Sequence, residues 1–105
     1  MDNFKIMYKI LRELEKNMGN EDFSFYSISA GHLKIPYNQW EQLLIAMSDN
    51  GYIKGIIIDR TLGDKFRHIV EPIYPEITIK GMEYLANNSF MAKAKEALKM
   101  AGEII

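Results

Sequence analysis

Apolar residues recur every three or four positions along the first twenty residues, which is the spacing of one face of an α-helix. They are Phe4, Met7, Ile10, Leu11, Leu14 and Met18. This pattern predicts a helix from Asn3 to Met18, capped by Asn3 and ended by Gly19, because glycine adopts left-handed backbone angles without strain. Residues 23–26 are largely aromatic and predict a short strand after this helix.

Two further helices are predicted before residue 50. Ser27 is expected to cap a short helix that extends from Ile28 to Leu33. Pro36 suits the first turn of the next helix, because its missing N–H is not needed there, and this helix extends to about Asp49. Its inward face is expected to be Trp40, Leu43, Leu44 and Met47. The short gap between the two helices is typical of a helix-turn-helix.

The hydrophobic pattern changes to that of β-strands after Gly51. Residues 52–59 and 66–70 are rich in β-branched residues and predict two strands, and the turn residues around Gly63 join them as a hairpin. Pro72 and Pro75 then forbid a continuous regular element, because proline lacks the N–H that a sheet requires.

Two helices are predicted after the hairpin. Thr78 is expected to cap the first, from Ile79 to Asn87, which turns Met82 and Leu85 inward. Residues 87–89 form a break, and a last helix extends to the C-terminus. One face of that helix carries Phe90, Met91, Ala94, Ala97, Leu98, Ala101 and Ile105. Alanines at this spacing allow another helix to approach closely, so the face either packs within the chain or joins two copies in a homodimer.

This order of elements predicts an α+β fold, a winged helix-turn-helix with two C-terminal helices. The length of 105 residues suits one domain. We expect a body over residues 1–88 and a possible dimerisation helix over residues 89–105. The core is predicted to contain Leu11, Leu14, Trp40, Leu44, Ile53 and Leu85.

Two short motifs resemble segments of bacterial winged-helix proteins. Residues 47–53 look like the "L-x-x-x-G-Y/L-I" exit from a recognition helix, and residues 77–85 are similar to the segment "L-T-x-x-G-x-x-Y-L". Gly51 allows the chain to reverse into the first wing strand, and Gly81 allows the fourth helix to pack closely. Over nearly its whole length the chain resembles the YjcQ-like family of small bacterial and prophage proteins. The resemblance implies a winged-helix fold, and no biochemical activity is established for the family.

Composition and motifs exclude several classes of function. The chain has no cysteine, which excludes disulfides, thiolate metal sites and cysteine nucleophiles. No apolar run approaches the roughly 20 residues that cross a bilayer. The N-terminus lacks a signal segment, so we expect a cytoplasmic protein without a membrane partner. His32 and His68 lie on different elements, and no nucleotide-binding or zinc motif is present. We therefore expect no enzyme, no metal and no cofactor.

A DNA-binding function requires base-reading side chains on the recognition helix and cations for the phosphates. The outward face is predicted to carry Asn38, Gln42, Ile45 and Asp49. Asn and Gln can pair with adenine, and isoleucine can touch a thymine methyl group. This helix contains no Lys or Arg, and Lys34 is the nearest cation. The hairpin adds Lys54, Arg60, Lys65 and Arg67, which either contact phosphates or guard the strand edges.

Four cations form a stripe on the solvent face of the first helix: Lys5, Lys9, Arg12 and Lys16. The stripe is either a solvated helix face or a surface for an acidic protein partner. Two hypotheses of function follow. The first is a DNA-binding or regulatory protein of prophage type, which binds double-stranded DNA. The second is a non-enzymatic protein-interaction adaptor with the same fold.

Overall fold

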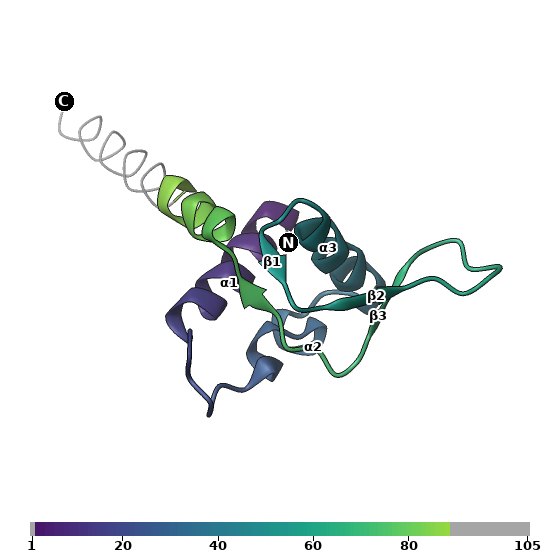
Figure 1. The fold of residues 1–105 in the computed structure, drawn as a ribbon, viewed down its shortest axis with the longest axis horizontal. Helices are drawn as coiled ribbons and strands as arrows, with labels where there is room; N and C mark the ends of the chain where they lie inside the picture. The colour runs from purple at the N-terminus through teal and green to yellow at the C-terminus, as the bar shows by residue number, and fades with distance from the viewer. Residues whose placement is uncertain (1, 89–105) are drawn as a thin grey trace.

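The computed structural model describes residues 2–88, and Figure 1 shows how their helices and strands are arranged. The elements are α1 (Asn3–Lys16), the 3₁₀-helix η1 (Phe25–Ile28), α2 (Ala30–Leu33), α3 (Tyr37–Asp49), β1 (Ile53–Lys54), β2 (Ile57–Asp59), β3 (His68–Val70) and β4 (Glu76–Ile77). A further helix begins at residue 79 and is described to residue 88. The residues that form the predicted last helix lie outside the described part of the chain.

The first helix forms as its apolar spacing predicts, with small differences at both ends. Its buried residues are Ile6, Met7, Ile10, Leu11 and Leu14. Asp2 is the N-cap in place of Asn3, because its side chain accepts a hydrogen bond from the Phe4 N–H at 2.8 Å. Phe4 and Met18 are exposed, so the buried stripe is centred on Ile10 and is shorter than predicted.

The predicted strand at residues 23–26 is wrong. Phe25 to Ile28 form a 3₁₀-helix, and the Phe25 ring packs edge-on against Phe23 at 5.0 Å and Tyr74 at 5.5 Å between ring centroids. Every described strand already has its one partner, so this segment finds no strand to pair with. Because η1 occupies Ser27, α2 starts later than predicted and is capped by Ser29, whose hydroxyl accepts from the His32 N–H at 3.2 Å.

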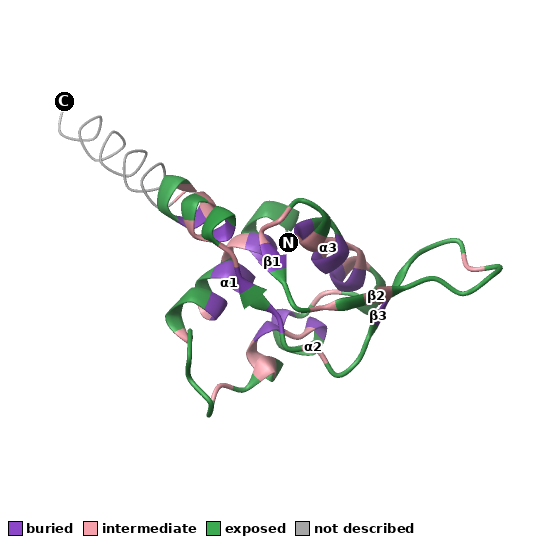
Figure 2. Cartoon of the chain, viewed as in Figure 1, coloured by how far each residue is buried: buried purple, intermediate pink, exposed green. Residues whose placement is uncertain are grey.

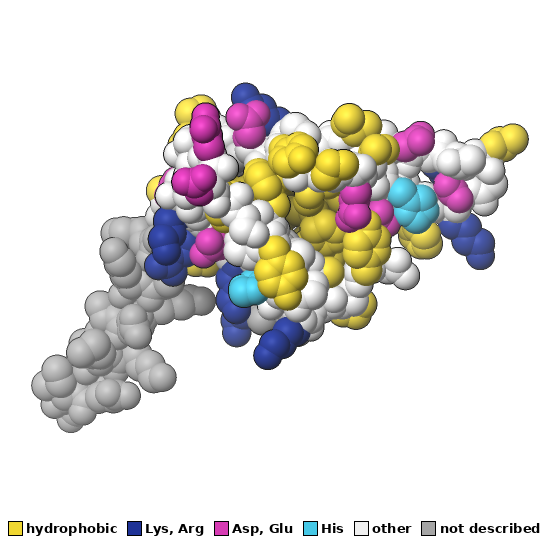
Figure 3. All heavy atoms as spheres, turned by 90° about the horizontal axis from the view of Figure 1, so that it is seen from below, with side chains coloured by type: hydrophobic (Ala, Val, Ile, Leu, Met, Phe, Trp, Pro, Cys, Tyr) yellow, Lys and Arg dark blue, Asp and Glu magenta, His cyan; other side chains and the backbone are white. Residues whose placement is uncertain are grey.

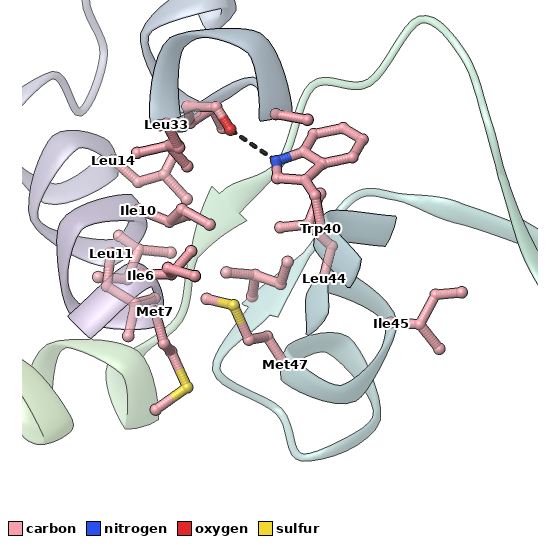
Figure 4. Packing of buried hydrophobic residues seen from close by; sticks show 14 of the residues in the cluster. Ile6, Met7, Ile10, Leu11, Leu14, Leu33, Trp40, Leu44, Ile45 and Met47 are labelled. Atoms are coloured by element: carbon pink, nitrogen blue, oxygen red, sulfur yellow. Dashed lines mark hydrogen bonds between the residues drawn. The ribbon is translucent and has the colours of Figure 1, made fainter. Parts of the chain in front are cut away.

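The turn between α2 and α3 is tight and is fixed by the core. Lys34 adopts left-handed backbone angles, with φ of 58°, and α3 begins directly after Pro36. The Trp40 indole N–H donates to the Ile28 carbonyl at 2.8 Å, which joins α3 to η1 (Figure 4). All six predicted core residues are buried: Leu11, Leu14, Trp40, Leu44, Ile53 and Leu85.

The strands form two small antiparallel pairs, β2 with β3 and β1 with β4. In the pair of β1 with β4, Ile53 is the partner of Ile77. The strand predicted over residues 52–59 is therefore divided into β1 and β2, which belong to different pairs. The division falls at Gly55, which has φ of +90° and lies so close to the Tyr74 carbonyl oxygen that a Cβ would be 3.0 Å from it. The strand β4 was not predicted. It pairs over only two residues, and Pro72 and Pro75 before it argue against a regular strand in this segment.

The helix that begins at residue 79 packs as closely as the sequence predicts. The Thr78 hydroxyl accepts from the Gly81 N–H at 3.1 Å and caps the helix. A Cβ on Gly81 would overlap the Tyr52 carbonyl oxygen and lie 2.7 Å from the Ile77 side chain. The predicted break at residue 87 is wrong, because residues 87 and 88 are helical. Figure 2 shows that the buried residues gather where α1, α3 and this helix meet.

Candidate interaction surfaces

Strands β2 and β3 and the loop between them, residues 57–70, form a hairpin that we call the wing. One α3 carboxylate fixes it with both oxygens. Oε1 of Glu41 lies 2.8 Å from the Nδ1 of His68, and Oε2 accepts from the Ile69 backbone N–H at 2.9 Å. Glu41 is only 3% exposed, so this acid is buried between α3 and β3.

Three more α3 side chains hold the wing or the chain that follows it. The Gln42 amide donates to the Arg67 carbonyl at 2.8 Å. Asp49 accepts two hydrogen bonds from the Arg67 guanidinium, at 2.6 and 3.1 Å. These bonds hold the pKa of Asp49 below its usual range. The Tyr37 hydroxyl donates to Glu71, and burial together with that contact raises the pKa of Tyr37 to about 12.

The wing therefore covers part of the face that was predicted to read DNA bases. Ile45 was expected to point outward, but it is 1% exposed, so its assignment as a base-contacting residue is wrong. Ile45 lies one helical turn after Glu41, on the same side of α3, and Figure 4 shows its side chain turned away from α1. Gln42 is half-buried and bound to the wing. Asn38 is exposed as predicted.

Other amides on the outward face of α3 also have intramolecular partners. The Gln39 amide donates to the Asn3 side chain at 2.8 Å, and the Asn50 amide donates to the Ala46 carbonyl at 2.8 Å. The hollow between this face and the wing is lined by Leu43, Ala46 and Phe66 as well as by amides. The face thus combines apolar groups with amides, and two of these amides, Gln39 and Gln42, already donate hydrogen bonds within the chain.

The cations predicted for DNA contact are spread over several elements. Arg60 and Lys65 are exposed in the loop of the wing, and the Arg60 Nε donates to the Asp64 carbonyl at 3.1 Å. Lys54 is also exposed, but it lies on β1, which pairs with β4, and so is not part of the hairpin as predicted. Arg67 forms the ion pair with Asp49. Lys34 lies at the end of α2 and lines another hollow, which contains no residue of the wing.

That hollow, between α1 and α2, has a volume of about 720 Å³, and we call it the basic groove. It is lined by Lys9, Arg12, Glu13, Lys16, Ser27, His32, Leu33 and Lys34. Figure 3 shows dark blue Lys and Arg side chains flanking one histidine along the lower edge of the molecule. Lys5 of the predicted stripe is exposed but does not line the groove. The sequence separates Lys34 from the stripe, and the fold brings them together because η1 packs against both α1 and α2.

The contact between Glu41 and His68 predicts a pH-dependent stability. The hydrogen bond to Glu41 is the main cause that raises the pKa of His68, and the Asp64 charge adds to it. Because the folded pKa is raised, the stabilisation is fully present below the unfolded value of about 6.5 and is lost as pH rises through the folded pKa. Thermal unfolding followed by circular dichroism from pH 5 to 9 should show a loss that His68→Gln lacks. An equal loss in that variant would contradict the prediction.

The described arrangement is that of a winged helix, in which α2 and α3 form the helix-turn-helix and the wing packs beside α3, with η1 in place of the predicted first strand. A family model described as "YjcQ protein" matches residues 8–104, so the chain belongs to this family. Searches of curated proteins and of solved structures found no match.

Among residues 2–88, none of the helices is long and apolar enough to cross a bilayer. Within the same residues, no group of three or more His, Asp or Glu side chains is placed to hold a metal ion.

Proposed function

We propose that this protein is a non-enzymatic adaptor that acts through protein contacts, and that α3 does not read DNA bases. The observation that carries the proposal is the use of α3 polar side chains to hold the wing. Glu41, Gln42 and Asp49 all bind β3 or the residue before it. A bidentate contact to adenine needs both groups of an amide at once. Gln42 would have to give up its bond to Arg67 to make one.

Electrostatics support the same conclusion. α3 contains no Lys or Arg, and phosphate contacts supply much of the affinity of proteins for DNA. The net charge of the whole chain is -1, so no long-range field attracts a polyanion. Apolar side chains beside α3, such as Leu43 and Phe66, suit a protein surface.

A mobility-shift assay with random and genomic duplexes, over a series of salt concentrations, tests this proposal. We expect no complex that prefers one sequence. We also expect Asn38→Ala to leave the mobility of every duplex as it is with the unmodified protein, because the amide of this exposed residue is not used for base contact. A sequence-preferring complex that is lost in Asn38→Ala would contradict the proposal. Circular dichroism of both proteins controls for folding.

A second candidate function is DNA binding through the wing, which is favoured by the exposed cations Arg60 and Lys65. In this mode the hairpin lies along the phosphates without reading bases through α3. Contact with four phosphates would change log K with log salt at a slope of about -3.6. In the same assay, a shift that is independent of sequence and is lost in Arg60→Glu/Lys65→Glu would favour this mode.

We further propose a cytoplasmic regulatory role of prophage type, exerted by a homodimer. The support for the dimer is the apolar face predicted for residues 89–105, with Phe90, Ala94, Leu98, Ala101 and Ile105. Light scattering at micromolar concentration should give twice the chain mass, and Leu98→Asp should give the single mass while circular dichroism is unchanged. A single mass for the unmodified chain at high concentration would contradict the dimer.

A further inference from the structure

The basic groove brings four cations together, and no residue of the wing lines it. Lys9, Arg12 and Lys16 occupy three successive turns of α1, and Lys34 joins them from the end of α2. At about 1.5 Å per residue, the three α1 cations span roughly 10 Å along the helix. None of these four cations forms an ion pair with any residue from 2 to 88. Their charge therefore remains available to a ligand.

The other groups that line the groove leave most of this positive charge uncompensated. Its one carboxylate, Glu13, accepts a weak hydrogen bond at 3.5 Å from the Asn17 amide. The His32 ring packs edge-on against the ring of Tyr26, a residue that is 65% exposed. The groove thus offers cations together with an exposed aromatic ring at its side.

From these contacts we propose that the basic groove binds an acidic protein segment that also carries an apolar residue. The inference rests on the proposed adaptor function and names the chemistry of its partner. Carboxylates of the segment would pair with Lys9, Arg12 and Lys34, while the apolar residue packs on Tyr26. Hydrogen bonds between such charged groups are stronger than neutral ones, and they add specificity at a contact surface.

A protein segment suits the groove better than a DNA duplex does. The hollow of about 720 Å³ is large enough for a few side chains. A duplex presents its phosphates in long rows, and the -1 net charge of the chain gives it no general attraction to such a polyanion. Local charge complementarity is sufficient for a short acidic segment, because its few carboxylates all fall within the cluster.

Fluorescence anisotropy with the full chain tests the inference. The probe is a labelled decapeptide of glutamate residues with one central leucine, titrated at 50 and 200 mM salt. Lys9→Glu/Lys34→Glu reverses two groove cations, and Arg60→Glu/Lys65→Glu makes the same change of charge on the wing. We expect the groove variant to weaken binding at least about tenfold, and the wing variant to leave it within about twofold. Circular dichroism establishes that both variants are folded.

Three outcomes would overturn the inference: no binding of the peptide, equal losses in both variants, or a loss confined to the wing variant. A 20-base-pair duplex is titrated in parallel. If the duplex binds more tightly than the peptide, and if the groove variant no longer binds the duplex, the groove binds nucleic acid and the inference is wrong. The adaptor proposal itself fails on a different result, which is a sequence-preferring complex with a duplex that is lost in Asn38→Ala. The two failures can therefore be told apart.

Discussion

Replacing Trp40 with alanine is expected to lower the free energy of unfolding by about 3–5 kcal/mol. The side chain is 3% exposed and is packed with α1 and α3 residues in the core. Its loss would leave a cavity and would also remove the indole donor to the Ile28 carbonyl, the bond that joins α3 to η1. Urea denaturation followed by circular dichroism measures the change, because the variant has no tryptophan fluorescence.

A conservative variant separates the two contributions of Trp40. Trp40→Phe keeps most of the ring volume but cannot donate to Ile28, so its loss of stability should be smaller than that of Trp40→Ala. Asn38→Ala, at an exposed position of the same helix, serves as a surface control. A loss below about 1 kcal/mol for Trp40→Ala would show that the indole is not part of the core.

The second large effect is expected for Glu41→Ala, which should destabilise the fold by about 1–3 kcal/mol. The substitution leaves the buried N–H of Ile69 without its acceptor and removes the partner of His68. Because both groups belong to β3, the wing should also open more often. Amide hydrogen exchange at Ile69 should therefore increase more than exchange in α1, measured as a control in the same sample.

Glu41→Gln is the matched control for this prediction. Its amide oxygen can still accept from the Ile69 N–H, and its NH₂ group can donate to a ring nitrogen of neutral His68. The variant should therefore lose less stability than Glu41→Ala, and its stability should vary less with pH. Equal losses in the two variants would indicate that the hydrogen bonds of Glu41 do not hold the wing.

Helical periodicity predicted most of the body, because buried positions three and four residues apart dominate α1 and α3. The Leu11, Trp40 and Leu44 side chains illustrate this, since each lies in the core as expected. Turn chemistry was equally informative at Thr78 and Gly81, where a cap and a close backbone approach both appear. In each of these cases the signal is local, and the packing agrees with it.

The predictions that are wrong concern residues whose structure depends on contacts with segments far away in the sequence. Ile45 and Glu41 lie on the side of α3 that the wing covers, and their burial depends on where β3 packs. No pattern within α3 distinguishes that side from the solvent side. The aromatic residues around Phe25 have the composition of a strand, but the described fold offers them no strand partner. The wing thus changes both the predicted site and the assignment of its residues.

The basic groove was predicted only in part, for a related reason. The stripe on α1 follows directly from helical spacing, and Lys9, Arg12 and Lys16 are exposed as expected. Lys34 was assigned to the DNA-facing side, because in sequence it immediately precedes the recognition helix. The left-handed turn at Lys34 and the packing of α2 place this residue on the groove. A resemblance to a fold cannot supply such a detail.

An NMR titration of the ¹⁵N-labelled full chain with the acidic peptide is the most direct test of where a partner binds. If the basic groove is the binding site, the largest shifts of amide signals will fall in residues 9–16 and 27–34. The signals of α3 and of the wing tip, residues 60–67, will change little. Largest shifts in α3 and the wing tip would contradict this assignment and would place the binding surface on the helix and hairpin instead.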